Sequence, residues 1–316
     1  MKAHLQSRKG KGYRKEIILF NLRQEEYIMW LYEQLKTQKY KHGGYTVFYI
    51  TEPKLRRIEK SKYIDRIVHR WYVNSFIKPY FIPQFIYTSY ACLQEKGMHK
   101  ACSDVQKAMK HCKSIWGEYY ILKMDIQKYF ENIDKDIIYK IIQRKIKDDK
   151  ILWLTREILY SNEGPKNLPI GNYTSQMFAN IYLNELDQYV KHKLKGKYYF
   201  RYMDDAVLMR KTKEETRQDL EKIKKFLKEK LELELNQKTQ IFKNKQGVNF
   251  CGYKINEYRL KIREKGKKKL KKKVKELKKR VETREIDSKE AKRYLAGHLG
   301  YMKIANVNSL KEKLFY

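Results

Sequence analysis

The sequence is poor in proline and has no long apolar run. It contains 5 prolines in 316 residues, and no Gly/Ser-rich or proline-rich stretch divides it. We therefore expect its parts to follow one another without a flexible linker. No apolar run approaches the roughly 18–20 residues of a membrane-spanning helix, and the basic start "MKAHLQSRKGKGYRK" leads only into the short "IILF". These absences argue against a membrane span and a signal peptide, and they predict a soluble, cytoplasmic protein.

Cysteine is also scarce, with four residues: Cys92, Cys102, Cys112 and Cys251. No C-x-x-C pair occurs, so a disulfide framework is not expected. The stretch "GMHKACSDVQKAMKHCKSIWG" does bring together residue types that bind zinc: His99, Cys102, His111 and Cys112. Its apolar residues recur at helical spacing, however. We favour a buried helix over a zinc site.

What the sequence has in excess is positive charge. Lys and Arg total 72 against 37 Asp and Glu, which gives a formal net charge of +35. Hydrophobic residues make up 42% of the chain, too many for a disordered basic tail. A folded protein with this balance favours a polyanionic partner, nucleic acid before an anionic membrane.

The C-terminal part concentrates this charge. The stretch "EKGKKKLKKKVKELKKRVETRE" (264–285) carries Leu270, Val274, Leu277 and Val281 at alternating four- and three-residue steps. We interpret it as an amphipathic helix that lies along a phosphate backbone. The alternative is a solvated helix whose charge only maintains solubility.

Periodicity predicts most of the remaining elements. Helices are expected over 21–38, 63–77, 173–190 and 214–231, and strands over 45–50, 119–126 and 239–242. Asp134 is expected to cap the helix that follows it. The stretch "YYFRYMDDAVLMR" (198–210) predicts two strands around a tight turn.

Three carboxylates stand at the ends of these strands. Asp125 ends one expected strand, and Asp204 and Asp205 lie in the tight turn. If the strands are neighbours, the three carboxylates meet at one sheet edge and raise one another's pKa unless cations neutralise them. Hard divalent ions suit such a site, Mg²⁺ above all, and two ions about 3.5–4 Å apart form the clamp used in phosphoryl transfer. The alternative is a solvated turn and an unrelated Asp125.

The stretch "YMDD" (202–205) resembles the signature of reverse transcriptases, and other motifs of that family occur in order. They are "EPKLRRIEKSKYIDRIVH" (52–69), "KMDIQKYFENID" (123–134), "LPIGNYTSQ" (168–176), "LELNQKT" (233–239) and "FCGY" (250–253). The similarity runs from about residue 50 to the C-terminus. It implies an RNA-directed DNA polymerase of the α+β class with the right-hand fold of fingers, palm and thumb.

The resemblance also implies the reacting groups. Two Mg²⁺ ions would be held by Asp125, the backbone carbonyl of Ile126, Asp204 and Asp205, with Asp205 tuning the first ion site. Lys238 would protonate the leaving pyrophosphate.

Further roles follow from the same resemblance. Phe130 would exclude a ribose 2′-hydroxyl, and Lys54 and Arg56 would hold the triphosphate. The implied nucleotide-binding residues are Lys54, Arg56, Phe130, Ile170, Gly171 and Gln176. The implied primer grip consists of Phe250, Gly252 and Tyr253.

The expected division is fingers over 1–86 with a basic N-terminal arm, palm over 87–254 with 136–168 returning to the fingers, and thumb over 255–316. The expected partners are template RNA, an RNA/DNA duplex and dNTPs. One departure from the family is Ile64, where Arg is common. Triphosphate contacts are therefore expected to shift to Lys60 or Lys62.

The stretch "LPIGNYTSQ" (168–176), which resembles the second palm motif of the family and is called the second motif below, points to a subtype. Most members have Gln before the Gly and Pro after the Ser, where this chain has Ile170 and Gln176. This form resembles the reverse transcriptases of diversity-generating retroelements, as do "SYACLQEKGMHKA" (89–101) and "YLAGHLGYMKIAN" (294–306). An apolar Ile170 cannot hydrogen-bond the incoming nucleotide as Gln would, which fits careless copying of adenines. Such an enzyme would have a small basic accessory protein as a partner.

Other interpretations stay open. Ile170 can simply pack against the sheet in an enzyme of ordinary fidelity. An untemplated or catalytically idle protein of phage defence is a second alternative. A retron or group II-like enzyme is a third, although the chain shows no zinc-binding nuclease extension and no Val-Thr-Gly signature in its thumb.

Overall fold

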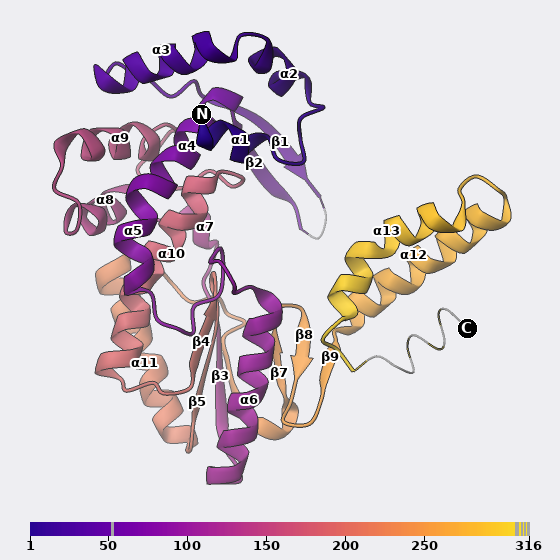
Figure 1. Ribbon diagram of the computed structural model, residues 1–316. Coiled ribbons are helices and arrows are strands. Elements are labelled where there is room, and N and C mark those ends of the chain that lie inside the picture. The colour runs from indigo at the N-terminus through magenta and orange to yellow at the C-terminus, as the bar shows by residue number, and fades with distance from the viewer. Residues whose placement is uncertain (52–53, 307–309, 311, 313, 315–316) are drawn as a thin grey trace. The chain divides into compact units, whose positions relative to one another are not determined.

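The computed structural model describes residues 1–51, 54–306, 310, 312 and 314 (Figure 1). Two compact units make up the chain. The first contains residues 1–86, 126–193 and 223–235, and the second contains 87–125, 194–222 and 236–316. The three-part division expected from the sequence stays a prediction.

The first unit is mostly helical. Its helices are α1 (Lys2–Arg8), α2 (Lys15–Leu22), α3 (Gln24–Lys36), α4 (Tyr63–Tyr72), α5 (Lys78–Phe81), α7 (Tyr129–Asn132), α8 (Lys135–Gln143), α9 (Asp149–Leu159) and α10 (Tyr173–Gln188). Short 3-10 or π turns extend three of these helices: η1 (Val73–Ile77), η2 (Ile82–Gln84) and η3 (Tyr189–Lys193). The strands β1 (Tyr45–Ile50) and β2 (Arg56–Ser61) form an antiparallel hairpin.

Several helices of the first unit form where the sequence predicted them. Asp134 accepts hydrogen bonds from the backbone N–H groups of Asp136 and Ile137, which confirms the predicted cap of α8. α10 buries residues around its whole circumference and contacts α4 and α8, so it forms the centre of this unit. The predicted helix over 63–77 is α4 continued by the π-helical η1.

The second unit contains two antiparallel sheets. The four-stranded sheet has the order β4-β5-β3-β6, with β3 (Tyr120–Asp125), β4 (Tyr199–Tyr202), β5 (Asp205–Arg210) and β6 (Gln240–Lys243). The three-stranded sheet consists of β7 (Val248–Phe250), β8 (Tyr253–Ile255) and β9 (Leu260–Ile262). A 3-10 turn, η4 (Asn244–Gln246), precedes β7. The helix α11 (Lys213–Leu231) follows β5, and its residues from 223 on belong to the first unit.

The helix α6 (Met98–Trp116) packs on the four-stranded sheet. Its buried side chains, Cys102 and Cys112 among them, share one core with Ile121 of β3 and Val207 of β5. Within the described residues, no group of His, Cys, Asp and Glu side chains is arranged to hold a metal ion. The burial of this face confirms the buried helix expected over this stretch.

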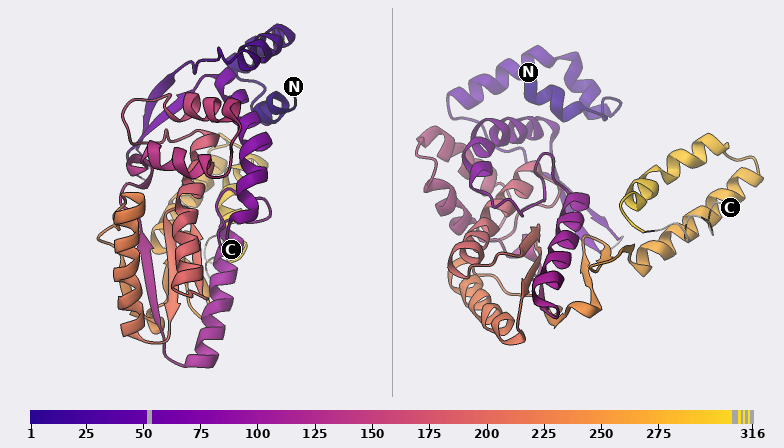
Figure 2. Two further views of the ribbon diagram at one scale, coloured as in Figure 1. Left: turned by 90° about the vertical axis from the view of Figure 1, so that its left-hand side faces the viewer. Right: turned by 60° about the horizontal axis from the view of Figure 1, so that its bottom comes forward.

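The predicted basic helix is α12 (Glu264–Glu282), which lies beside α13 (Ser288–Met302) in Figure 1 and in the right-hand view of Figure 2. Leu270, Val274 and Leu277 are buried, so the apolar stripe faces the protein as expected. The mixed helix and sheet content, with antiparallel strands, confirms the α+β class. In the described part of the chain, no helix is long and apolar enough to span a bilayer.

Candidate functional site

The predicted carboxylates gather at one end of the four-stranded sheet. Asp125 is the last residue of β3 and Asp205 is the first residue of β5, and the register makes them direct partners. Asp204 lies in the turn that joins β4 to β5. Asp205 was expected in the same turn but is the first residue of β5, because it pairs with Tyr202 and Asp125. Opposed residues of antiparallel strands have Cα atoms roughly 4.5–5.5 Å apart, so these side chains share one edge.

The turn that carries Asp204 is strained. Tyr202 pairs with Asp205, which leaves a two-residue connection of Met203 and Asp204. Met203 has φ +54, a left-handed conformation that costs a non-glycine residue about 1–2 kcal/mol. Nη1 of the buried Arg201 donates to the Met203 carbonyl at 3.0 Å. A buried guanidinium therefore holds the turn in this conformation.

The environment of Asp205 favours its neutral form. Burial raises its pKa to about 6, the Lys123 ammonium opposes this shift, and the charges of Asp204 and Asp125 add to it. Lys123 forms an ion pair with Asp205, whose side chain is 29% exposed. Lys123 Nζ also lies 5.9 Å from the centroid of the Phe250 ring.

Sequence reasoning missed Lys123 as a member of this site. The signal available was a single cation inside the otherwise apolar strand "YYILKMDI". The carboxylate oxygens fit a hard divalent cation. Among the described residues, however, no three acidic side chains are arranged so that they could hold a metal ion together. Asp205 instead forms an ion pair with Lys123.

The segment that contains Lys238 runs beside Asp125. The backbone N–H of Asn236 donates to the Asp125 carbonyl at 2.7 Å. The Asn236 side chain in turn accepts from the backbone N–H of Lys238 at 3.0 Å. Ile126, the expected backbone ligand, forms an isolated antiparallel bridge with Leu235.

Phe130, Ile170 and Gly171, three of the predicted nucleotide-binding residues, lie in the first unit. The Ile170 carbonyl accepts from the N–H of Glu59 in β2 at 3.2 Å, and the Phe130 carbonyl accepts from the N–H of Leu168 at 2.8 Å. Gly171 has φ +115, and a Cβ there would lie 3.3 Å from Ile58 Cγ2. Only glycine fits this approach without strain.

A buried lysine holds the loop over 162–165, which precedes the second motif (168–176). Lys135 is fully buried, and its Nζ donates to the carbonyls of Asn162 and Gly164 at 2.7 Å each. Its backbone N–H bonds the Pro165 carbonyl at 2.9 Å. No sequence pattern singled out Lys135, because a lysine after a helix cap is usually solvated.

The other predicted contacts stay predictions. Gln176 lies in the first turn of α10, and Arg56 begins β2. Lys54 is exposed. It follows residues 52–53, the first two of the motif over 52–69, which lie outside the described residues. Lys60, one of the alternative triphosphate ligands, pairs with Glu16 at 3.0 Å.

The expected primer grip is a β-hairpin. Phe250 ends β7, Tyr253 begins β8, and the two are register partners. The connecting residues Cys251 and Gly252 have φ +46 and +85, the two positive values of a tight hairpin turn. Burial is nearly complete for Phe250 and Tyr253, so the hairpin is anchored in the core of the second unit.

A family model described as "Reverse transcriptase (RNA-dependent DNA polymerase)" matches residues 51–255. The protein YkfC of Escherichia coli strain K12 is 27% identical over 252 residues, which cover 67% of this chain and 66% of that protein. The group II intron-encoded protein LtrA of Lactococcus lactis is 24% identical over 309 residues, 74% of this chain and 50% of that protein. The chain thus spans half to two thirds of the length of these curated relatives.

Solved structures with a similar fold include telomerases. The telomerase of Candida albicans, in complex with a TWJ fragment of telomeric RNA, aligns with a TM-score of 0.52 at 12% identity over 77% of this chain and 50% of that one. Apo telomerase of Candida tropicalis gives 0.51 at 12% identity over 70% and 49%. This likeness is one of fold, and it confirms the expected right-hand polymerase fold.

Proposed function

This chain belongs to the reverse transcriptase family, and from that premise we propose that it is an RNA-directed DNA polymerase that makes cDNA on an RNA template. One observation carries the proposal. Asp125 and Asp205 are register partners at the ends of β3 and β5, with Asp204 in the adjoining turn. Acidic groups from two distant segments are what nucleotidyl transfer requires at a growing DNA end.

We assign the binding of two Mg²⁺ ions to Asp125, the Ile126 carbonyl and Asp204. When bound, such ions supply positive charge that activates the primer 3′-hydroxyl and neutralises the leaving pyrophosphate. Asp205 has the lesser, tuning role, because the Lys123 ammonium already neutralises much of its charge. Lys238 is the proton donor to pyrophosphate, held in its turn by Asn236.

Binding roles complete the proposal. Phe130 excludes the 2′-hydroxyl, Ile170, Gly171 and Gln176 contact the nucleotide, and Lys54 and Arg56 hold its triphosphate. The hairpin of Phe250, Gly252 and Tyr253 holds the primer. The partners are template RNA, an RNA/DNA duplex and dNTPs, and the location is the cytoplasm.

For the subtype we propose a diversity-generating retroelement enzyme with errors directed to adenines. The supporting observation is Ile170, whose half-buried side chain cannot hydrogen-bond a base. Such an enzyme would work with a small basic accessory protein. One alternative is a group II-like or retron enzyme, which the similarity to an intron-encoded protein favours. A second alternative is an enzyme of antiviral defence that synthesises DNA without a template.

The test is primer extension on a defined RNA with Asp204→Ala. Loss of this carboxylate should reduce extension at least about 100-fold, as loss of a charge-stabilising group at a reacting centre does. RNA affinity should stay within about twofold, because Asp204 repels phosphate rather than binds it. Glu25→Ala, which removes an exposed carboxylate on α3, is the matched control and should extend normally.

Normal extension by Asp204→Ala would remove the polymerase assignment. Sequencing of the wild-type products separates the subtypes. A template copy with errors at adenines supports the retroelement enzyme, an accurate copy supports the group II-like alternative, and random DNA supports untemplated synthesis.

A further inference from the structure

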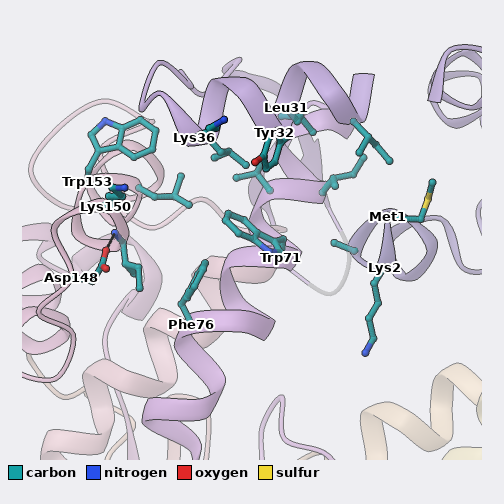
Figure 3. A pocket seen from close by; sticks show the side chains of 17 residues that line it. Met1, Lys2, Leu31, Tyr32, Lys36, Trp71, Phe76, Asp148, Lys150 and Trp153 are labelled. Atoms are coloured by element: carbon teal, nitrogen blue, oxygen red, sulfur yellow. Dashed lines mark hydrogen bonds between the residues drawn. The ribbon is translucent and has the colours of Figure 1, made fainter. Parts of the chain in front are cut away.

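An apolar groove opens on the first unit, among α1, α3, α4, η1 and α9 (Figure 3). Its volume is about 670 Å³, within the range of pockets that enclose a ligand. The side chains that form its walls are mainly aliphatic and aromatic, including Leu31, Tyr32, Trp71, Phe76, Trp153 and Leu154.

α3 contributes a complete helical stripe to this groove. Ile28, Leu31, Tyr32 and Leu35 follow the i, i+3, i+4, i+7 spacing of an amphipathic helix, and all four line the groove. Leu31 is the only residue of α3 that is buried. Tyr32 stays 54% exposed, and Trp71 of α4 stays 36% exposed. The apolar face of α3 is therefore only partly covered by the described part of the chain, and Tyr32 is its most exposed member.

Contiguous exposed apolar surface of this kind usually marks an interaction site. An amphipathic helix that lays its own apolar face into such a groove matches the i, i+3, i+4, i+7 pattern of α3. The groove volume accommodates several large apolar side chains of such a helix.

The rim of the groove is positively charged. Lys2, Lys36 and Lys150 line it together with one acidic residue, Asp148. The Asp148 carboxylate accepts a hydrogen bond from the Ile151 N–H at 2.9 Å and caps the N-terminus of α9. Its negative charge therefore interacts with the backbone N–H groups of that helix. In the described part of the chain, none of the three lysines forms an ion pair.

This rim decides between possible occupants. A second copy of the chain carries the same +35 charge and is repelled. A basic partner is disfavoured for the same reason. RNA would find cations at the rim, but the aliphatic walls offer its phosphates and bases no hydrogen bonds.

We propose that this groove is a docking site for an amphipathic helix of an acidic partner protein. The apolar face of that helix enters the groove between α3 and α9, and its flanking carboxylates meet Lys36 and Lys150. Charge complementarity at the rim speeds the encounter, and apolar burial supplies the affinity. The proposal is independent of the polymerase activity, because its residues lie outside the carboxylate edge and the second motif.

Synthetic peptides and the full-length protein provide the test. The probe is a fluorescent helical peptide with Leu at i, i+3, i+4 and i+7 and Glu at the flanking positions, measured by anisotropy at about 0.15 M salt. One matched peptide carries Lys in place of Glu. A second keeps every Glu but carries Gln in place of Leu, which controls for attraction to the basic surface as a whole. The first peptide should bind at least tenfold more tightly than either control.

Variants locate the binding. Tyr32→Glu places a carboxylate at an exposed position of the groove and should weaken the acidic amphipathic peptide at least tenfold. Leu19→Glu is its matched control, because Leu19 is similarly exposed, at 53%, but lies on α2 outside the groove. It should change the affinity less than twofold. The double variant Lys36→Glu/Lys150→Glu should favour the Lys peptide instead. Circular dichroism confirms that each variant is folded.

Four results of the peptide experiments would overturn the proposal, and a fifth comes from the oligomeric state. The four are no binding of the acidic amphipathic peptide, equal binding of its Gln control, unchanged affinity in Tyr32→Glu, and displacement of the peptide by an RNA oligonucleotide. Self-association that Tyr32→Glu abolishes, seen by light scattering, would assign the groove to a second copy and would equally exclude an acidic partner there.

Discussion

At the residue scale, a histidine pair in the first unit sets the response to acid. The ring of His69 is fully buried and stacks on His42, with centroids 5.2 Å apart. Within the described residues, neither ring nitrogen of His69 has a hydrogen-bond partner. Burial lowers the pKa of His69 to about 3, and the charge of His42 adds to this effect. The folded protein therefore keeps His69 neutral where an unfolded chain would protonate it.

From the lowered pKa of His69 we predict that the protein loses stability in mild acid. Because the folded pKa lies below the unfolded value of 6.5, the unfolded state binds more protons as the pH falls from about 6.5 towards 3. The free energy of unfolding should drop by about 2 kcal/mol between pH 7 and pH 5 from His69 alone. Urea denaturation at the two pH values measures it.

His69→Phe, which keeps a ring without a titrating nitrogen, should remove most of this difference. His192→Gln is the control, because His192 is exposed, and it should behave as the wild type does. Identical pH dependence in His69→Phe and the wild type would contradict the account.

At the scale of elements, the start of α8 is tied to the loop before the second motif. Lys135 follows the cap residue Asp134 and bonds the carbonyls of that loop. The loop leads into Leu168, which bonds the Phe130 carbonyl, and into Ile170, which bonds β2. A substitution of Lys135 should therefore shift this loop, and with it the proposed nucleotide-binding residues that follow it in the chain.

Lys135→Met should destabilise the protein by about 2–3 kcal/mol, because it removes the charged donor of the two 2.7 Å hydrogen bonds to the carbonyls of Asn162 and Gly164. It should also raise KM for dNTPs more than it lowers kcat, since the proposed binding residues shift while the carboxylates do not. Urea denaturation and steady-state kinetics measure the two effects. The control, Lys140→Met, changes an exposed lysine of the same helix and should stay within about 0.5 kcal/mol. Equal stability of the two variants would contradict the role of Lys135.

At the scale of the whole molecule, the net charge of +35 is concentrated in helices such as α12. Lys268, Lys272 and Lys275 are exposed, and each precedes a buried residue of α12 by two positions. Two positions correspond to a rotation of about 200°, so these lysines lie opposite the apolar stripe. That face is free to follow a phosphate backbone.

Binding of an RNA/DNA duplex should therefore weaken steeply with salt, by about 0.9 log units per log unit of salt for each phosphate contact. The triple variant Lys268→Gln/Lys272→Gln/Lys275→Gln should reduce the slope by about 2.7. Affinity measured by anisotropy across a salt series checks this.

The matched control neutralises three exposed lysines of α11: Lys222, Lys228 and Lys230. It removes the same charge and should leave the slope nearly unchanged. An equal reduction in both variants would assign the salt dependence to net charge rather than to α12.

Much of the fold followed from local patterns. The helix α6, the cap at Asp134 and the apolar stripe of α12 were all predicted correctly, because each depends on residues within a few positions of one another. The helix α3 lies within the helix that was predicted over 21–38. The partner of its apolar face was not predicted, because periodicity shows that a face is apolar and not what covers it.

By itself, the sequence determined where strands end and turn, and so it determined that Asp125 ends a strand and that Asp204 lies in a tight turn. Only the tertiary structure decided that β3 pairs with β5 in the register that opposes Asp125 to Asp205, and that Lys123 pairs with Asp205. The same holds for the bonds from Lys135 to the loop of Asn162 and Gly164. The physical reason is that strand ends and turns arise from short-range sterics and hydrogen bonds. Pairing across the chain depends instead on which apolar faces pack together, and many sequence positions contribute to that choice at once.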